Sequence, residues 1–92
     1  MLKEYSEAEK IANKIYTEIE LAKESGDGYR RSFYLPAKLL TYDYNVTVQS
    51  YEILITWKQN NFKIISEVEN ISGQITPGWN MIENKKGEIY VS

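Results

Sequence analysis

The order of hydrophobic patterns constrains the fold of this 92-residue chain more than any other feature, because a helical repeat comes first and strand-like alternation fills the rest. Between Ser6 and Glu24, apolar residues recur at helical spacing and fall on one face of a helix: Ala8, Ile11, Ala12, Ile15, Ile19 and Ala22. The opposite face is polar and carries Glu7, Lys10, Lys14, Glu18 and Glu24. The pattern therefore predicts one amphipathic helix over about residues 6–25.

The two ends of this helix have separate signals. Ser6 and Glu9 fit a capping box at a helix start, but Ser6 fits a position inside a longer helix equally well. Gly26 and Gly28 flank Asp27 and end the helix, because glycine tolerates the left-handed backbone found at helix C-termini.

Period-two alternation predicts strands over residues 29–35, 42–48, 52–57, 62–68, 81–83 and 88–91. Residues 58–61 and 84–87 are expected to form hairpin turns, and residues 75–78 a loop. Short turns favour antiparallel pairing. We therefore expect an α+β fold in a single domain, residues 1–92, with the N-terminal amphipathic helix packed on one face of an antiparallel β-sheet. The sheet would have four to six strands over about residues 29–92.

This arrangement specifies a core. The helix would contribute Ile11, Ile15 and Ile19. The sheet would cover them with Ile53, Ile55, Phe62, Ile64, Ile82 and Ile89.

The residue types that are missing exclude several kinds of chemistry. The chain has no cysteine and no histidine, so it lacks disulfides, thiolate metal sites and the commonest general base. Its net charge is -2 and its basic residues do not cluster, which disfavours nucleic-acid binding. No apolar run reaches the roughly 20 residues needed to span a bilayer. Either the chain is soluble, or it begins downstream of an export segment.

The carboxylates give no convincing catalytic or metal site. Glu67 and Glu69 share one strand face, where a solvated pair is preferred over a glycosidase pair because no cleft surrounds it. Asp27 and Asp43 lack the spacing of a calcium loop. No glycine elbow frames a nucleophilic serine. We expect a protein that is not an enzyme, with no cofactor and no metal.

Three residues remain as candidate surface sites. Asn45 and Asn70 begin N-x-Ser/Thr sequons, and the alternation points Asn45 and Thr47 toward solvent. Two sequons are only a weak excess over chance, so both stay hypotheses that depend on export. Among the aromatic residues, Trp79 beside Pro77 and Gly78 is the one expected to be exposed, which makes it a candidate ligand contact, although core packing and strand propensity account for most aromatic residues in such a sheet.

Several segments together resemble archaeal type IV pilins with class III signal peptides. They are the helix from Ala8 to Ala22, the break Gly26-Asp27-Gly28, the strand ending Tyr34-Leu35-Pro36 and the closing stretch over residues 77–91. The family is defined by an N-terminal processing site and a hydrophobic helix that packs in the filament core, and this sequence contains neither.

The resemblance therefore implies the soluble head domain of an exported, pilin-like structural subunit, truncated near Met1-Leu2-Lys3. It implies a place in an extracellular cell-surface filament, with a structural or adhesive role. Other pilin subunits would be partners through the missing helix, which would also be the one membrane contact, and the fragment itself would be a monomer. The alternative is a soluble peptide- or carbohydrate-binding module that uses an exposed strand edge or Trp79.

Overall fold

The computed structural model describes residues 3–49, 51–65 and 71–92, and it contains one long helix followed by seven strands. Helix α1 spans Lys3–Ser25. The strands are β1 (Arg30–Leu35), β2 (Asn45–Gln49), β3 (Glu52–Trp57), β4 (Asn60–Ile65), β5 (Ile71–Gly73), β6 (Gly78–Lys85) and β7 (Glu88–Val91). The α+β class is confirmed.

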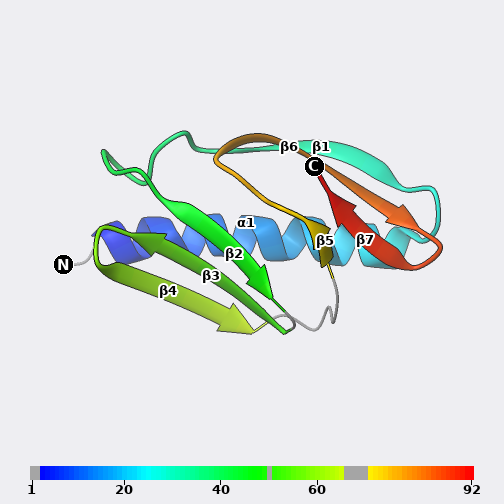
Figure 1. Ribbon diagram of the computed structural model, residues 1–92, viewed down its shortest axis with the longest axis horizontal. Coiled ribbons are helices and arrows are strands. Elements are labelled where there is room, and N and C mark those ends of the chain that lie inside the picture. The colour runs from blue at the N-terminus through cyan, green and yellow to red at the C-terminus, as the bar shows by residue number, and fades with distance from the viewer. Residues whose placement is uncertain (1–2, 50, 66–70) are drawn as a thin grey trace.

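The strands form two sheets rather than the single sheet that we expected (Figure 1). One sheet has the order β1-β6-β7-β5 and the other β2-β3-β4, and α1 packs against both. All neighbouring strands are antiparallel except β5 and β7, which pair in parallel. Strand β5 was not predicted, because three residues with one half-buried side chain carry no recognisable alternation.

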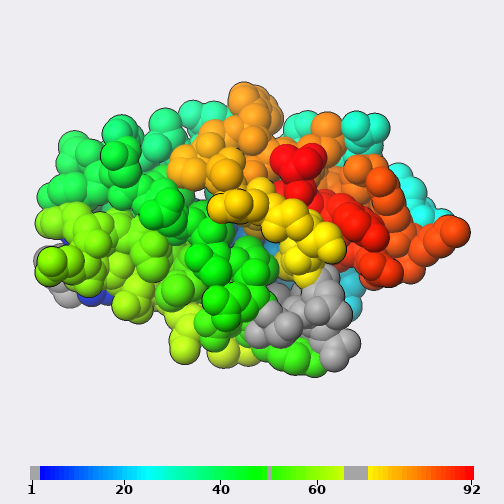
Figure 2. All heavy atoms as spheres, viewed as in Figure 1, coloured from blue at the N-terminus to red at the C-terminus, as the bar shows by residue number. Residues whose placement is uncertain are grey.

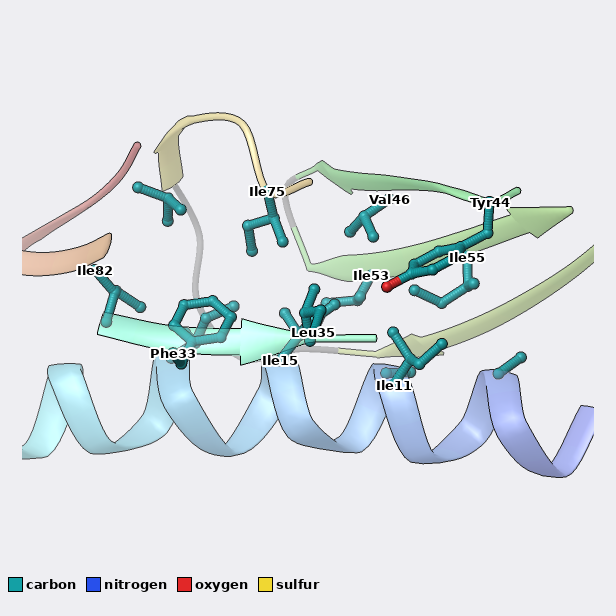
Figure 3. Close-up of a cluster of buried hydrophobic side chains, with 14 of the residues drawn as sticks. Ile11, Ile15, Phe33, Leu35, Tyr44, Val46, Ile53, Ile55, Ile75 and Ile82 are labelled. Carbon is teal, nitrogen blue, oxygen red and sulfur yellow. The ribbon is translucent and has the colours of Figure 1, made fainter. Parts of the chain in front are cut away.

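The helix runs along a body that measures 41 × 22 × 17 Å. Its 23 residues account for about 35 Å of that length. The apolar stripe of α1 is buried as predicted, and Figure 3 shows Ile11 and Ile15 pointing from the helix toward side chains of both sheets. Ile53, Ile55, Ile82 and Ile89 are buried in the same core, while Phe62 and Ile64 pack against it half-buried.

Two details of the predicted helix need correction. Ser6 does not start α1, because the helix already includes Lys3, so the interpretation of Ser6 as a residue inside a longer helix is the right one. Glu18, predicted on the polar face, is only 2% exposed. Arg31 Nε lies 3.2 Å from Glu18 Oε1 and Lys14 Nζ lies 3.8 Å from Oε2, so two cations beside the sheet edge compensate the buried carboxylate. The Arg31 contact meets the distance of an ion pair but not the geometry of a hydrogen bond.

The end of the helix is tied to the last hairpin by a buried amide. Gly26 has a φ of 85°, as expected for a residue that ends a helix. Asn84 Nδ2 donates to the carbonyl of Ala22 at 2.9 Å, and Asn84 Oδ1 accepts from the Gly87 backbone N–H at 2.8 Å. Lys86 and Gly87 form the two-residue turn between β6 and β7, both with positive φ, which confirms the turn expected there.

Candidate functional site

The most exposed tryptophan lies on the outer face of the four-stranded sheet, the face turned away from α1. Along β6, buried Asn80, Ile82 and Asn84 alternate with side chains that point outward, and Trp79 is 71% exposed. Trp79 stands directly opposite Tyr34 of β1, which is 47% exposed. The two rings meet edge to face, with their centroids 5.3 Å apart and their planes at 62°. The predicted exposure of Trp79 thus agrees with the structure, whereas its partner Tyr34 was missed.

A buried asparagine fixes the turn that leads into Trp79. Asn80 is 3% exposed, and its Oδ1 accepts from the Thr76 backbone N–H at 3.0 Å. Its Nδ2 donates to the carbonyls of Thr76 and Gly78 at 2.8 and 3.2 Å. Gly78 has a φ of 94°, a backbone conformation that residues other than glycine rarely adopt. The backbone before Trp79 is therefore held in one shape, and the indole is presented from a rigid support.

The outer face continues from the aromatic pair into a polar region. Ser32 stands opposite Met81, one outward-facing row away from Tyr34 and Trp79. Arg30 Nε donates to Met81 Sδ at 3.4 Å, and Ser32 Oγ lies 3.8 Å from the same sulfur. We call the five residues Arg30, Ser32, Tyr34, Trp79 and Met81 the outer platform. It combines two exposed rings with a guanidinium and a hydroxyl.

A shallow hollow of about 310 Å³ borders the other side of Tyr34. It is lined by Glu7, Lys10, Ile11, Lys14, Tyr34 and Pro36. The lysines do not offer free charge there, because Lys10 lies 3.3 Å from Glu7 and Lys14 lies 3.8 Å from Glu18. The hollow therefore extends the apolar surface of Tyr34 without adding a strong anion-binding group.

Behind this hollow lies a tyrosine with a perturbed pKa. The Tyr44 hydroxyl donates to the Pro36 carbonyl at 2.6 Å, and its ring belongs to the core. Burial, with a smaller contribution from Tyr34, raises the pKa of Tyr44 to about 12. A phenol that holds its proton this firmly is a structural hydrogen-bond donor rather than an acid or base at neutral pH.

A second hollow, of about 210 Å³, lies where the two sheets meet. It is lined by Val46, Thr47, Val48, Ile71, Gly73, Gln74 and Ile75. Figure 2 shows the green atoms of the region that includes β2 beside the yellow atoms of β5 and the residues that follow it. The lining contains no charged side chain, so it provides little to orient a ligand.

The other residues singled out in the sequence do not converge on a site. Asn45 begins β2 and is exposed, with Thr47 half-buried, while Asn70, Glu67 and Glu69 lie outside the described residues. Asp27 accepts from the Lys86 backbone N–H and Asp43 pairs with Lys38. Within the described part of the chain, no group of three or more His, Cys, Asp or Glu residues is placed to hold a metal ion.

Comparisons with protein-family models, with curated proteins and with solved structures each found no match for this chain. Across residues 3–49, 51–65 and 71–92, no helix is both long and apolar enough to cross a membrane.

Proposed function

We propose that this chain is the non-catalytic head domain of a pilin-like filament subunit displayed outside the cell. The orientation of α1 carries this proposal. The helix lies along the longest dimension of the body, and its first turn is at one tip (Figure 1). A hydrophobic helix continuous with α1 would therefore extend away from the head along its long axis, leaving the sheets to face outward.

The first turn of α1 is fixed to the hairpin of β3 and β4, which supports the same proposal. The ring of Tyr5 meets that of Trp57 edge to face at 5.1 Å. Trp57 Nε1 donates to Glu4 Oε1 at 2.9 Å, and the Tyr5 hydroxyl donates to Asn60 Oδ1 at 3.3 Å. These contacts hold the helix start at a defined angle to the head. A subunit that assembles through a helix needs such a rigid junction, because mobility there would let the orientation of the head vary from one subunit of the filament to the next.

The test compares the 92-residue chain with a longer one that includes the sequence preceding it in its gene. We expect the 92-residue chain to be monomeric, because the apolar stripe of α1 is already covered by the sheets. We expect the longer chain to insert into membranes or form filaments, since an added hydrophobic helix supplies a second large apolar surface.

Light scattering of the short chain and electron microscopy of the long one measure the two outcomes. Filaments from the short chain alone would contradict the proposed mechanism, and so would a native start at Met1 with full function retained. In the native host, we also expect a glycan on the exposed side chain of Asn45, which intact-mass analysis of native material detects.

The outer platform favours a second candidate function, a binding module. Trp79 is 71% exposed on a preorganised support beside the exposed ring of Tyr34, and tryptophan and tyrosine are enriched at contact surfaces. This candidate needs no filament, so a ligand-binding assay on the soluble chain tests it independently.

A further inference from the structure

We propose that the outer platform binds an acidic carbohydrate, stacking a pyranose ring on Trp79 beside Tyr34 and pairing a sugar carboxylate with Arg30. This inference rests on the binding-module candidate and does not depend on filament assembly. It would apply equally to a free domain and to a filament head that displays the same face.

The size of the aromatic surface points to a small ligand rather than a protein. A fully covered aromatic side chain buries about 150–250 Å², so Trp79 and Tyr34, 71% and 47% exposed, offer roughly 200–300 Å² together. One side of a standard protein interface covers about 800 Å². The aromatic pair matches one or two sugar rings, whose C–H faces stack on an aromatic ring while their hydroxyls stay in water.

The platform is also preorganised for such a ligand. Asn80 locks the turn before Trp79 through three hydrogen bonds, and Tyr34 supports the indole edge to face. Little conformational entropy is lost when a ring settles on groups that are already ordered, which matters because a single stacked sugar gains little energy.

The guanidinium of Arg30 specifies the charge of the ligand. One of its five N–H groups is directed to Met81 Sδ, and no carboxylate of the described residues lies within 4.0 Å of it. Glu83, opposite Arg30 in register, instead lies 4.0 Å from Lys85. The remaining N–H groups of Arg30 can therefore donate to both oxygens of a carboxylate, in the bidentate geometry that guanidinium groups favour.

The spacing along the strand suits one ligand reaching both parts. Met81 follows Trp79 by two residues on the same face, about 7 Å along β6. Arg30 lies against the Met81 sulfur. When a sugar ring stacks on Trp79, the guanidinium would therefore lie beside the edge of that ring or beside the next ring of an oligosaccharide.

The experiment titrates the soluble chain with trimers of galacturonate and of glucuronate and with their methyl esters, which keep the rings but lose the charge. Calorimetry gives affinity, and tryptophan fluorescence reports on Trp79 because Trp57 is only 2% exposed. We expect at least one acidic trimer to bind, to do so about tenfold more tightly than its ester, and to weaken as salt is added.

Matched variants locate the site. Trp79→Ala should weaken binding by about tenfold, since it removes the stacking surface. Arg30→Gln should remove both the preference for acid over ester and the salt dependence, and Arg30→Lys should restore part of each. Lys63→Gln removes one positive charge from β4 and should change nothing. Thermal melts of every variant separate lost binding from lost folding.

Three results would overturn the inference: no binding of either acidic trimer, equal binding of acid and ester, or undiminished binding by folded Trp79→Ala. Equal binding of acid and ester, lost in Trp79→Ala, would leave a carbohydrate-binding module in place while refuting the acidic ligand. None of these results bears on filament assembly, which the extended chain tests separately.

Discussion

Replacing Asn84 tests how firmly the last hairpin is tied to the helix. This side chain is 2% exposed and bridges the carbonyl of Ala22 and the N–H of Gly87. Asn84→Ala removes the buried amide that donates to the Ala22 carbonyl, so a buried hydrogen bond and the packing of the amide are lost, at a cost of about 1–3 kcal/mol. Gly87 is exposed, so water can satisfy its N–H after the substitution. We therefore expect the alanine variant to lose about 2 kcal/mol of unfolding free energy.

Asn84→Asp should lose more than the alanine variant, although it is closer in shape to asparagine. The carboxylate still accepts from Gly87, but it places negative charge against the carbonyl of Ala22. Ala22 lies in the last turn of α1, where the helix dipole is already negative. Burying a charge without a counter-ion in such a place costs more than losing one hydrogen bond to that carbonyl.

Thermal and urea unfolding, followed by circular dichroism, measure this order. In a domain of this size, each kcal/mol lowers Tm by about 4–8 °C, so the alanine variant should melt about 8–16 °C below the parent and the aspartate variant lower still. Asn61, exposed on β4, provides the control, because the same two substitutions there should shift Tm by only a few degrees. An aspartate variant as stable as the alanine variant would refute the reasoning about the carbonyl and the dipole.

Three further substitutions test other parts of the fold. Ile15→Asp puts a charge at a fully buried position and should unfold the domain, whereas Thr17→Asp on the exposed side of the helix should not. An unchanged Tm for Ile15→Asp would mean that α1 does not pack on the sheets. Gly73 has a φ of 99°, and a Cβ added there would lie 1.7 Å from the Val91 carbonyl oxygen. Gly73→Ala should therefore abolish the pairing of β5 with β7. Amide hydrogen exchange would detect this as lost protection in β5 while β3 stays protected. Burial raises the pKa of folded Tyr44 from 10.0 to about 12, so its contribution to the unfolding free energy is complete below pH 10 and is lost as the pH rises to 12, at about 1.4 kcal/mol per pH unit. Tyr44→Phe should therefore make the unfolding free energy, measured by urea titration, fall less steeply between pH 10 and 12. Equal pH dependence in the two proteins would contradict the burial argument.

The parts of the fold that could be predicted from sequence are those set by local periodicity. The apolar stripe of α1 and the strand at residues 52–57 follow from repeats that neighbouring residues reveal by themselves. The division into two sheets does not, because strand alternation shows which face is buried but not which strand lies alongside. The parallel pairing of β5 with β7 is the clearest case, since it requires close backbone contact at Gly73 that no local pattern encodes.

The candidate site divides in the same way. Exposure of Trp79 was predictable from its place after Pro77 and Gly78. Its partner was not predictable, because Tyr34 precedes Trp79 by 45 residues and lies opposite it only through the register of β1 with β6. Arg30 joins the platform through the same register. Glu18 was misassigned because a helical wheel shows charge and angle, but not that Arg31 from a neighbouring strand will cover one flank of the helix.

The two buried asparagines of β6 separate stability from presentation of the site. The Asn84 side chain bonds across to α1, so its loss should loosen the whole domain, whereas the three side-chain hydrogen bonds of Asn80 stay within residues 76–80. Asn80→Ala should therefore lower Tm less than Asn84→Ala, yet increase quenching of Trp79 fluorescence by acrylamide, because the indole loses its rigid support. In Asn84→Ala, measured well below its Tm, quenching of Trp79 should match the parent. If the two variants affected quenching and Tm in proportion, the turn at residues 76–80 would not be an independent support, and the platform would be ordered only by the fold as a whole.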